Sequence, residues 1–220
     1  MKTYMNAQEF NLVYERYRDL LYRIGYTYLK NEHDVADLLQ EVFVKRLYHA
    51  PSFQSEEHEK RWISPEYVLG QLTQYKLENP IEQDDELWLV IDKDKWTAKS
   101  IRAVAQRCAQ DSSYHLALSN PCFELWLILH IIDASLESDE EKVKMLKNRK
   151  EKKNADPYLK RKLRALLGSY SESNYDADQL VVQIAEAITR AETLDKNKKA
   201  RWPQGLGTHV YKLAKSITNQ

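Results

Sequence analysis

Residues 85–96 read DELWLVIDKDKW, and this stretch indicates the fold of the second part of the chain. Residues 87–91 are a short, uninterrupted apolar run, which is typical of a strand covered on both faces by helices. Asp92 and Asp94 follow where that strand ends. Ligands collect at the carboxyl ends of strands in open α/β sheets, and two such carboxylates can share one Mg²⁺ or Mn²⁺ ion. Without further context, a pair of turn or helix-cap aspartates is the favoured alternative.

The residues that follow predict a βαβ unit. Residues 97–110 carry apolar side chains at helical spacing, and residues 114–119, YHLALS, favour a second strand. The segment NPCFELWLILHII at 120–132 then predicts a helix that begins at Asn120 and Pro121 and is buried on most sides. Glu124 and His130 are polar residues inside this apolar helix. They cost free energy there unless they are paired or face a cleft.

Three motifs resemble the RloB family over roughly residues 66–218: DELWLVIDKDKW, ALSNPCFELWLILH at 117–130 and LGTHVYKLAKSI at 206–217. The resemblance implies a Toprim-type, metal-dependent nuclease fold that acts in abortive infection or phage defence beside an RloA-like partner ATPase. It also implies the roles of five residues: the Mg²⁺ ligands Asp92 and Asp94, and the candidate catalytic residues Asn120, Glu124 and His130. Cleavage of a phosphodiester needs the metal to polarise the phosphate and a nearby acid or base.

The chain departs from the Toprim pattern at its first strand. In that pattern the first strand ends in a glutamate, and the resemblance implies that this chain lacks the segment that would carry it. Either Glu124 substitutes for the missing carboxylate, or the site binds metal weakly and does no chemistry. A fusion of two truncated reading frames, with neither parental activity, is a further alternative.

The first part of the chain predicts two antiparallel helices. Apolar and aromatic residues recur every three or four positions over 10–30 and again over 35–47, with a short polar break between them. Short connections of this kind join antiparallel neighbours. A mostly helical N-terminal part therefore precedes the α/β part.

The motif DVADLLQEVFVKRL at 34–47, with its flanking residues, resembles region 2 of extracytoplasmic-function sigma factors over about residues 8–62. The resemblance implies that Asp37, Gln40 and Glu41 dock on core RNA polymerase. A solvated face of a small helical bundle is the alternative. The pattern stops near Ile63, and no helix-turn-helix for promoter reading follows. The predicted domains are therefore a sigma region 2-like helical segment, 1–63, and an RloB-like domain, 64–220.

Charge is balanced over the whole chain but not along it. The 220 residues contain 33 basic and 33 acidic side chains, so no global field favours nucleic acid or membrane. Residues 142–164, predicted to be helical on both sides of Pro157, hold eleven Lys and Arg against two acidic residues. Such a surface attracts phosphates, although a solvated lysine-rich face is an equal alternative. The predicted nucleic-acid contacts are Lys147, Arg149, Lys150, Lys152, Lys153 and Arg161.

Cysteine and histidine usage argues against a structural zinc ion. The two cysteines, Cys108 and Cys122, and the six histidines show no metal-ligand spacing. No signal peptide or membrane-length apolar run is present, so the expected location is the cytoplasm.

The combined prediction is an α/β protein with a mostly helical N-terminal part. A two-helix, sigma region 2-like hairpin precedes a truncated Toprim-like βαβ core with additional helices. The leading function is an RloB-like phage-defence nuclease that depends on Mg²⁺ and acts on nucleic acid, with activity in doubt because the first-strand glutamate is missing. The alternative is a transcription protein that binds RNA polymerase and DNA without catalysis.

Overall fold

The computed structural model describes residues 64–82, 85–170, 175 and 177–218. The two helices predicted over 10–30 and 35–47, and the polymerase-docking residues Asp37, Gln40 and Glu41, lie outside the described residues. The described residues within 64–170 and 177–218 belong to one compact unit, and the elements below lie in it.

A small mixed sheet forms the centre of this unit. Strands β1 (Leu87–Asp92) and β2 (Tyr114–Asn120) run parallel, and the two-residue strand β3 (Gly207–Thr208) pairs antiparallel with the end of β2. Helix α5 (Ala98–Cys108) connects the two parallel strands, so the predicted βαβ unit is confirmed. The register places Asp92 beside Ser119, and both therefore lie at the carboxyl edge of the sheet.

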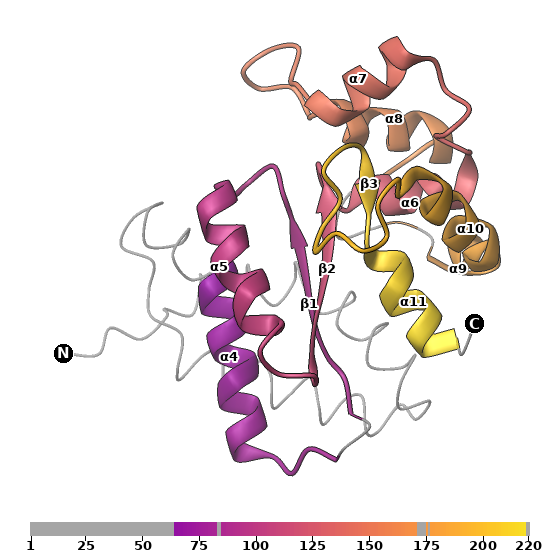
Figure 1. Cartoon of the computed structure of the whole chain (residues 1–220). Coiled ribbons are helices and arrows are strands. Elements are labelled where there is room, and N and C mark those ends of the chain that lie inside the picture. Colours follow the sequence, from indigo (N-terminus) through magenta and orange to yellow (C-terminus); the bar gives the residue numbers. More distant parts are fainter. Residues whose placement is uncertain (1–63, 83–84, 171–174, 176, 219–220) are drawn as a thin grey trace, which may run out of the picture. The chain divides into compact units, whose positions relative to one another are not determined.

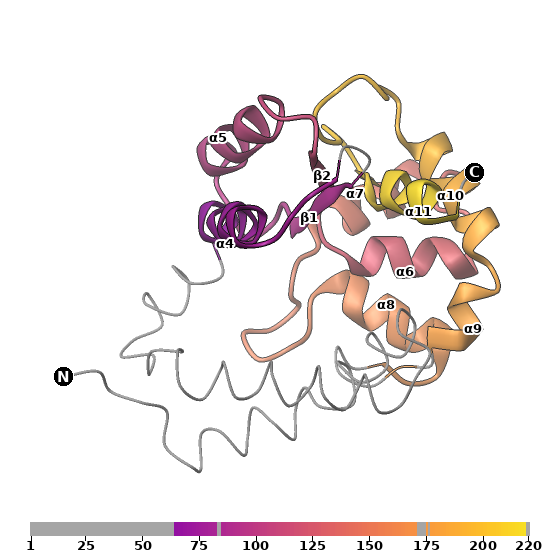
Figure 2. The same ribbon diagram turned by 90° about the horizontal axis from the view of Figure 1, so that it is seen from below.

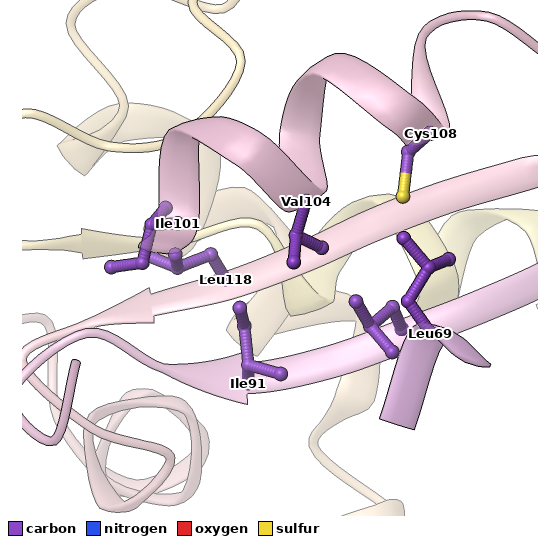
Figure 3. Close-up of a cluster of buried hydrophobic side chains, with 7 residues drawn as sticks. Leu69, Ile91, Ile101, Val104, Cys108 and Leu118 are labelled. Atoms are coloured by element: carbon purple, nitrogen blue, oxygen red, sulfur yellow. The ribbon is translucent and has the colours of Figure 1, made fainter. Parts of the chain in front are cut away.

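Two helices cover one face of the sheet. Helix α4 (Pro65–Glu78) lies beside α5, and both pack on the strands, as Figures 1 and 2 show. Side chains alternate between the two faces of a strand, and Leu89, Ile91 and Leu118 lie on the face that α4 and α5 cover. They form a core cluster with Leu69 and the α5 residues Ile101, Val104 and Cys108 (Figure 3).

The opposite face is covered around β2. Helices α6 (Glu124–Ile131) and α11 (Val210–Thr218) contact β2, and α8 (Tyr158–Leu167) and α10 (Ile184–Leu194) pack on α6 (Figure 2). Helix α6 is apolar around its whole circumference and is accordingly buried on most sides, as predicted. The two remaining described helices are α7 (Asp139–Lys147) and α9 (Ala177–Val181).

The prediction that β1 is covered on both faces is wrong. Leu89 is 1% exposed, but its neighbour Val90 is 43% exposed on the other face. Helix α11 reaches the β2 side of that face, and no described element pairs with the outer edge of β1. An apolar run is typical of a strand buried on both faces, but it cannot reveal which neighbours the tertiary structure supplies.

The basic region forms two helices and a loop between them. Helix α7 ends at Lys147 because Asn148 adopts the left-handed conformation, with φ 44°, and α8 begins only at Tyr158. A left-handed residue at this position is a common way to end a helix. The helical prediction for residues 148–157 is therefore wrong, and the basic residues at 149–153 lie on a loop that extends away from the helices in Figure 1.

The segment from Asn120 also differs from its prediction. Asn120 is the last residue of β2 rather than the first of a helix, and α6 begins at Glu124. The Pro121 carbonyl accepts hydrogen bonds from the backbone N–H groups of Lys93 and Asp94. Residues 121–123 are therefore held against the loop after β1 before the helix starts.

The C-terminal motif LGTHVYKLAKSI, for which no secondary structure was predicted, supplies β3 and α11. Among the described residues, no helix combines the length and apolar character that crossing a bilayer requires.

Candidate metal and nucleic-acid site

Asp92 lies half-buried at the end of β1 and faces the start of α6. Its Oδ1 accepts a hydrogen bond from the Phe123 backbone N–H at 2.8 Å, and its Oδ2 lies 3.6 Å from the Lys95 ammonium. Burial raises the pKa of Asp92 to about 6; Lys95 opposes the rise, and the carboxylates of Asp94 and Glu124 add to it. Asp92 therefore caps α6 and also belongs to a cluster of acidic groups.

Asp94 lies nearer the solvent and is held by Asn148. The Nδ2 of Asn148 donates to Oδ2 of Asp94 at 3.2 Å and also lies 3.3 Å from the Cys122 sulfur. Partial removal from water raises the pKa of Asp94, the Asn148 hydrogen bond opposes this rise, and Glu124 adds to it. The alternative of turn or helix-cap aspartates fits in part: Asp94 lies in the turn after β1, whereas Thr97 caps the following helix α5.

Glu124 is the first residue of α6 and provides a third carboxylate at this edge. Its charge raises the pKa of both Asp92 and Asp94, which places the three acids within electrostatic range of one another. It also raises the pKa of the buried Cys122 thiol, whose burial is the larger cause. The charges of three acids, Asp92 and Asp94 at and after the end of β1 and Glu124 at the start of α6, therefore influence one another.

The acidic cluster has the donor chemistry of a magnesium site. Mg²⁺ prefers oxygen ligands and is bound in many enzymes by one or two carboxylates, with waters and substrate phosphates completing the shell. Burial is the largest cause of the raised pKa of Asp92, and the charges of Asp94 and Glu124 add a smaller repulsion, which a bound cation relieves. Among the described residues, no three His, Cys, Asp or Glu side chains are arranged as a ready-made metal cage. Asp92 and Asp94 remain the predicted Mg²⁺ ligands.

Asn120 lies at the same edge, and its side-chain amide contacts the segment before β3. Its Nδ2 donates to the carbonyl oxygens of Gly205 at 2.6 Å and Pro203 at 3.1 Å. The side chain is buried and ties the end of β2 to the segment before β3. Asn120 therefore positions a loop beside the acidic cluster.

His130 lies in the last turn of α6, six positions after Glu124. Its Nδ1 is 2.9 Å from the Trp126 carbonyl oxygen, and its ring packs edge-on against the Trp126 ring. Burial lowers the pKa of His130, so the neutral form is favoured. The structure does not bring His130 into contact with Asp92 or Asp94, and these contacts account for a histidine in an apolar helix.

The predicted nucleic-acid contacts separate into two groups. Arg161 pairs with the Glu151 carboxylate and stacks over Tyr158, 5.7 Å from the ring centroid. The other five form no ion pair with a described residue and are exposed; they are Lys147, Arg149, Lys150, Lys152 and Lys153. The uncompensated charge of the basic region is thus concentrated at the end of α7 and on the loop that follows.

Asn148 connects this basic loop with the acidic cluster, and the sequence did not single it out. Besides its contacts with Asp94 and Cys122, its Oδ1 accepts a hydrogen bond from the Leu159 backbone N–H at 2.9 Å. The side chain is buried, and the basic loop begins at the next residue. Asparagine after a lysine-rich helix is a recognisable helix end, but nothing in the sequence indicates which acid it contacts.

The fold and the site define a class: an α/β protein with an acidic cluster at the carboxyl edge of two parallel strands and a basic loop beside it. The sequence matches the family described as RloB-like protein over residues 26–217. The chain belongs to this family, which confirms the resemblance inferred from its motifs. No curated protein and no solved structure shows a significant match to the chain.

The family match begins earlier than the resemblance indicated. It starts at residue 26 rather than near 66, and so includes about two thirds of the stretch that resembles sigma factors. The sigma-like reading, the boundary at residue 63 and the docking of polymerase on Asp37, Gln40 and Glu41 stay predictions. The RloA-like ATPase partner likewise stays a prediction.

Proposed function

We propose that the protein is a Mg²⁺-dependent nuclease that acts in phage defence. The observation that carries the proposal is the cluster of Asp92, Asp94 and Glu124 at the carboxyl edge of β1 and β2. Membership of the RloB-like family supports the defence role that the motifs implied. The adjacent loop of unpaired Lys and Arg supports a substrate with a phosphate backbone.

The residues take distinct roles in this proposal. Asp92 and Asp94 hold the ion, and the hydrogen bonds from Phe123 and Asn148 orient the two carboxylates. Glu124 is the candidate base that removes a proton from the attacking water, in place of the glutamate of the first Toprim strand. Bound Mg²⁺ supplies polarisation of the phosphate and a lowered water pKa. The basic loop neutralises phosphates of the bound strand.

The test is metal-dependent cleavage by the full-length chain. Purified protein with Mg²⁺ or Mn²⁺ is incubated with labelled single- and double-stranded DNA and RNA, and products are separated on denaturing gels. We expect cleavage that EDTA abolishes. Asp94→Asn and Glu124→Gln should each reduce the rate by about 100-fold or more, because a metal ligand or base contributes on this scale. Asp94 is preferred to Asp92, whose carboxylate also caps α6.

The matched control is Asp111→Asn. Asp111 precedes β2 at the opposite edge of the sheet, where it pairs with Lys76 at 2.7 Å, so the change removes one acid without touching the cluster. Wild-type cleavage by this variant, with loss in the other two, supports the proposal. Cleavage that survives both Asp94→Asn and Glu124→Gln, or no cleavage of any of the four substrates, rejects it.

A further inference from the structure

A cavity of about 510 Å³ lies between α7 and the segment that connects α10 with β3. Its volume falls within the usual range for small-ligand sites. Apolar side chains form much of the wall: Val143 and Leu146 from α7, and Ala200, Pro203 and Leu206 from the connecting segment. Val143 and Leu146 are 44% and 36% exposed, so α7 presents apolar surface that other described residues leave uncovered.

Both walls of the cavity are attached to the residues around the acidic cluster. On one side, Leu146 lies two positions before Asn148, which donates its hydrogen bond to Asp94. On the other side, the Gly205 and Pro203 carbonyls accept hydrogen bonds from Asn120, at the end of β2. The cavity therefore belongs to the same edge of the unit as Asp92 and Asp94.

Charged side chains of both signs line the cavity. Lys142 and Lys196 line it, and neither forms an ion pair with another described residue. The exposed Asp139, the first residue of α7, lines it as well. Asp195 also lines it, but this carboxylate is buried and accepts hydrogen bonds from the Tyr211 hydroxyl at 2.9 Å and the Asn197 backbone N–H at 3.3 Å. Asn197 and Gln204 add amide groups that can donate and accept.

We propose that this cavity binds one unstacked nucleobase of the strand whose phosphate lies at Asp92 and Asp94. The proposal rests on the proposed function and names its substrate class: single-stranded or locally unpaired nucleic acid. A flat base packs between the apolar side chains of α7 and those of the connecting segment, and the flanking phosphates meet Lys142 and Lys196. A base paired within a duplex is stacked on its neighbours and cannot enter such a cavity without leaving the helix.

The test compares two single strands that carry the same charge. One is a fluorescein-labelled 12-residue oligothymidine, and the other is the same backbone with every base removed. Binding to the full-length chain is measured by fluorescence anisotropy in EDTA, so that no cleavage occurs. We expect the base-containing strand to bind about tenfold more tightly, because packing of a base against protein side chains adds affinity of this order.

The variant pair tests the cavity itself. The double change Val143→Ser and Leu146→Ser removes the apolar wall of α7, and it should bring the two affinities within about twofold of each other. The control double change, Val181→Ser and Val182→Ser, alters two exposed valines at and just after the end of α9 and should keep the tenfold preference. Unchanged affinity for the base-free strand shows that the variants are folded.

Three outcomes overturn the inference: equal binding of both strands by the wild type, a preference that survives the α7 change, or equal loss in the control. Its failure is distinguishable from failure of the nuclease proposal. Cleavage without base preference rejects the cavity and keeps the nuclease. Base preference without cleavage keeps the cavity and rejects the nuclease.

Discussion

Single buried polar side chains connect distant segments of this protein. Asn148 joins the end of α7, the loop after β1 and the start of α8 through the hydrogen bonds of one amide group. His209 likewise contacts residues from three segments. Its backbone N–H donates to the Leu118 carbonyl, and its ring lies between Asp195 and Lys212. The Asn148 amide has partners for its donor and its acceptor atom, whereas the buried Nε2 of His209 forms no hydrogen bond with a described residue.

The His209 imidazole makes stability depend on pH. The side chain is 1% exposed, its Nε2 is 3.1 Å from the Asp195 carboxylate, and its Nδ1 is 3.4 Å from the Lys212 ammonium. Burial and the Lys212 charge lower the pKa of His209 from 6.5 to about 4, against the opposing effect of Asp195. Between these pH values the unfolded chain binds a proton that the native state does not. The stability that the lowered pKa of His209 provides is therefore fully present above pH 6.5 and is lost as the pH falls towards 4.

We therefore expect protonation linked to His209 to lower the free energy of unfolding by about 3 kcal/mol as the pH falls from 6.5 to 4. Urea unfolding at several pH values measures it for the wild type and for His209→Gln, which should lose most of this acid sensitivity. His115→Gln, which changes a half-exposed histidine, is the control and should keep the wild-type slope. Identical slopes for all three proteins would contradict the assignment.

At the scale of elements, β1 has two unequal faces. Leu89 and Ile91 face α4 and α5, whereas Trp88 and Val90 face the side that α11 covers only near β2. On that side the Trp88 ring stacks on the His115 ring, with centroids 4.7 Å apart. Burial on the face shown in Figure 3 is therefore expected to account for most of what β1 contributes to the free energy of unfolding.

Two neighbouring substitutions test this asymmetry. Leu89→Ala removes a side chain that is 1% exposed and should lower the free energy of unfolding by about 2–5 kcal/mol, through lost burial and the cavity left behind. Val90→Ala changes the next residue, which is 43% exposed, and should cost less than about 1 kcal/mol. Chemical denaturation measures both. Similar losses would mean that the second face of β1 is covered as fully as the first.

For the whole molecule, balanced charge hides a local positive surface. Many basic residues of α7 and α8 are neutralised by acids; Lys162, for example, contacts Glu137 at 3.0 Å and Glu141 at 2.6 Å. The basic residues left without such partners are Lys142 and, close together in sequence, five residues from Lys147 to Lys153. A field of this kind acts over about 8–10 Å at physiological salt and then fades.

Salt dependence measures the contribution of this loop. Changing Lys147, Lys150 and Lys153 together to Ser should weaken binding of single-stranded DNA. It should also reduce the slope of log affinity against log salt by about 2, since each phosphate contact contributes about 0.7. Anisotropy titrations at several salt concentrations give the slope. The control changes three exposed basic residues of α5, Lys99, Arg102 and Arg107, to Ser. An equal reduction in the control would assign the effect to net charge alone.

Part of the site could be predicted because it follows from local pattern. The apolar run before Asp92 identified a strand and its end, and helical spacing identified the crossover that makes β2 parallel to β1. The carboxyl ends of parallel strands meet at one edge, so placing Asp92 and the residues after β2 together needed no tertiary information. Glu124 was singled out differently, as a polar residue in an apolar helix and through the resemblance to the RloB family.

The sequence by itself thus determined the βαβ unit, the apolar helix α6 and the acidic edge, because hydrophobic periodicity is a property of neighbours along the chain. Tertiary structure alone decided that Asn148 holds Asp94, that Asn120 turns to the Gly205 loop and that Val90 stays exposed. It also decided which lysines keep their charge unpaired. These outcomes depend on contacts between residues far apart in sequence, 54 positions for Asn148 and Asp94, and local pattern carries no information about such pairs.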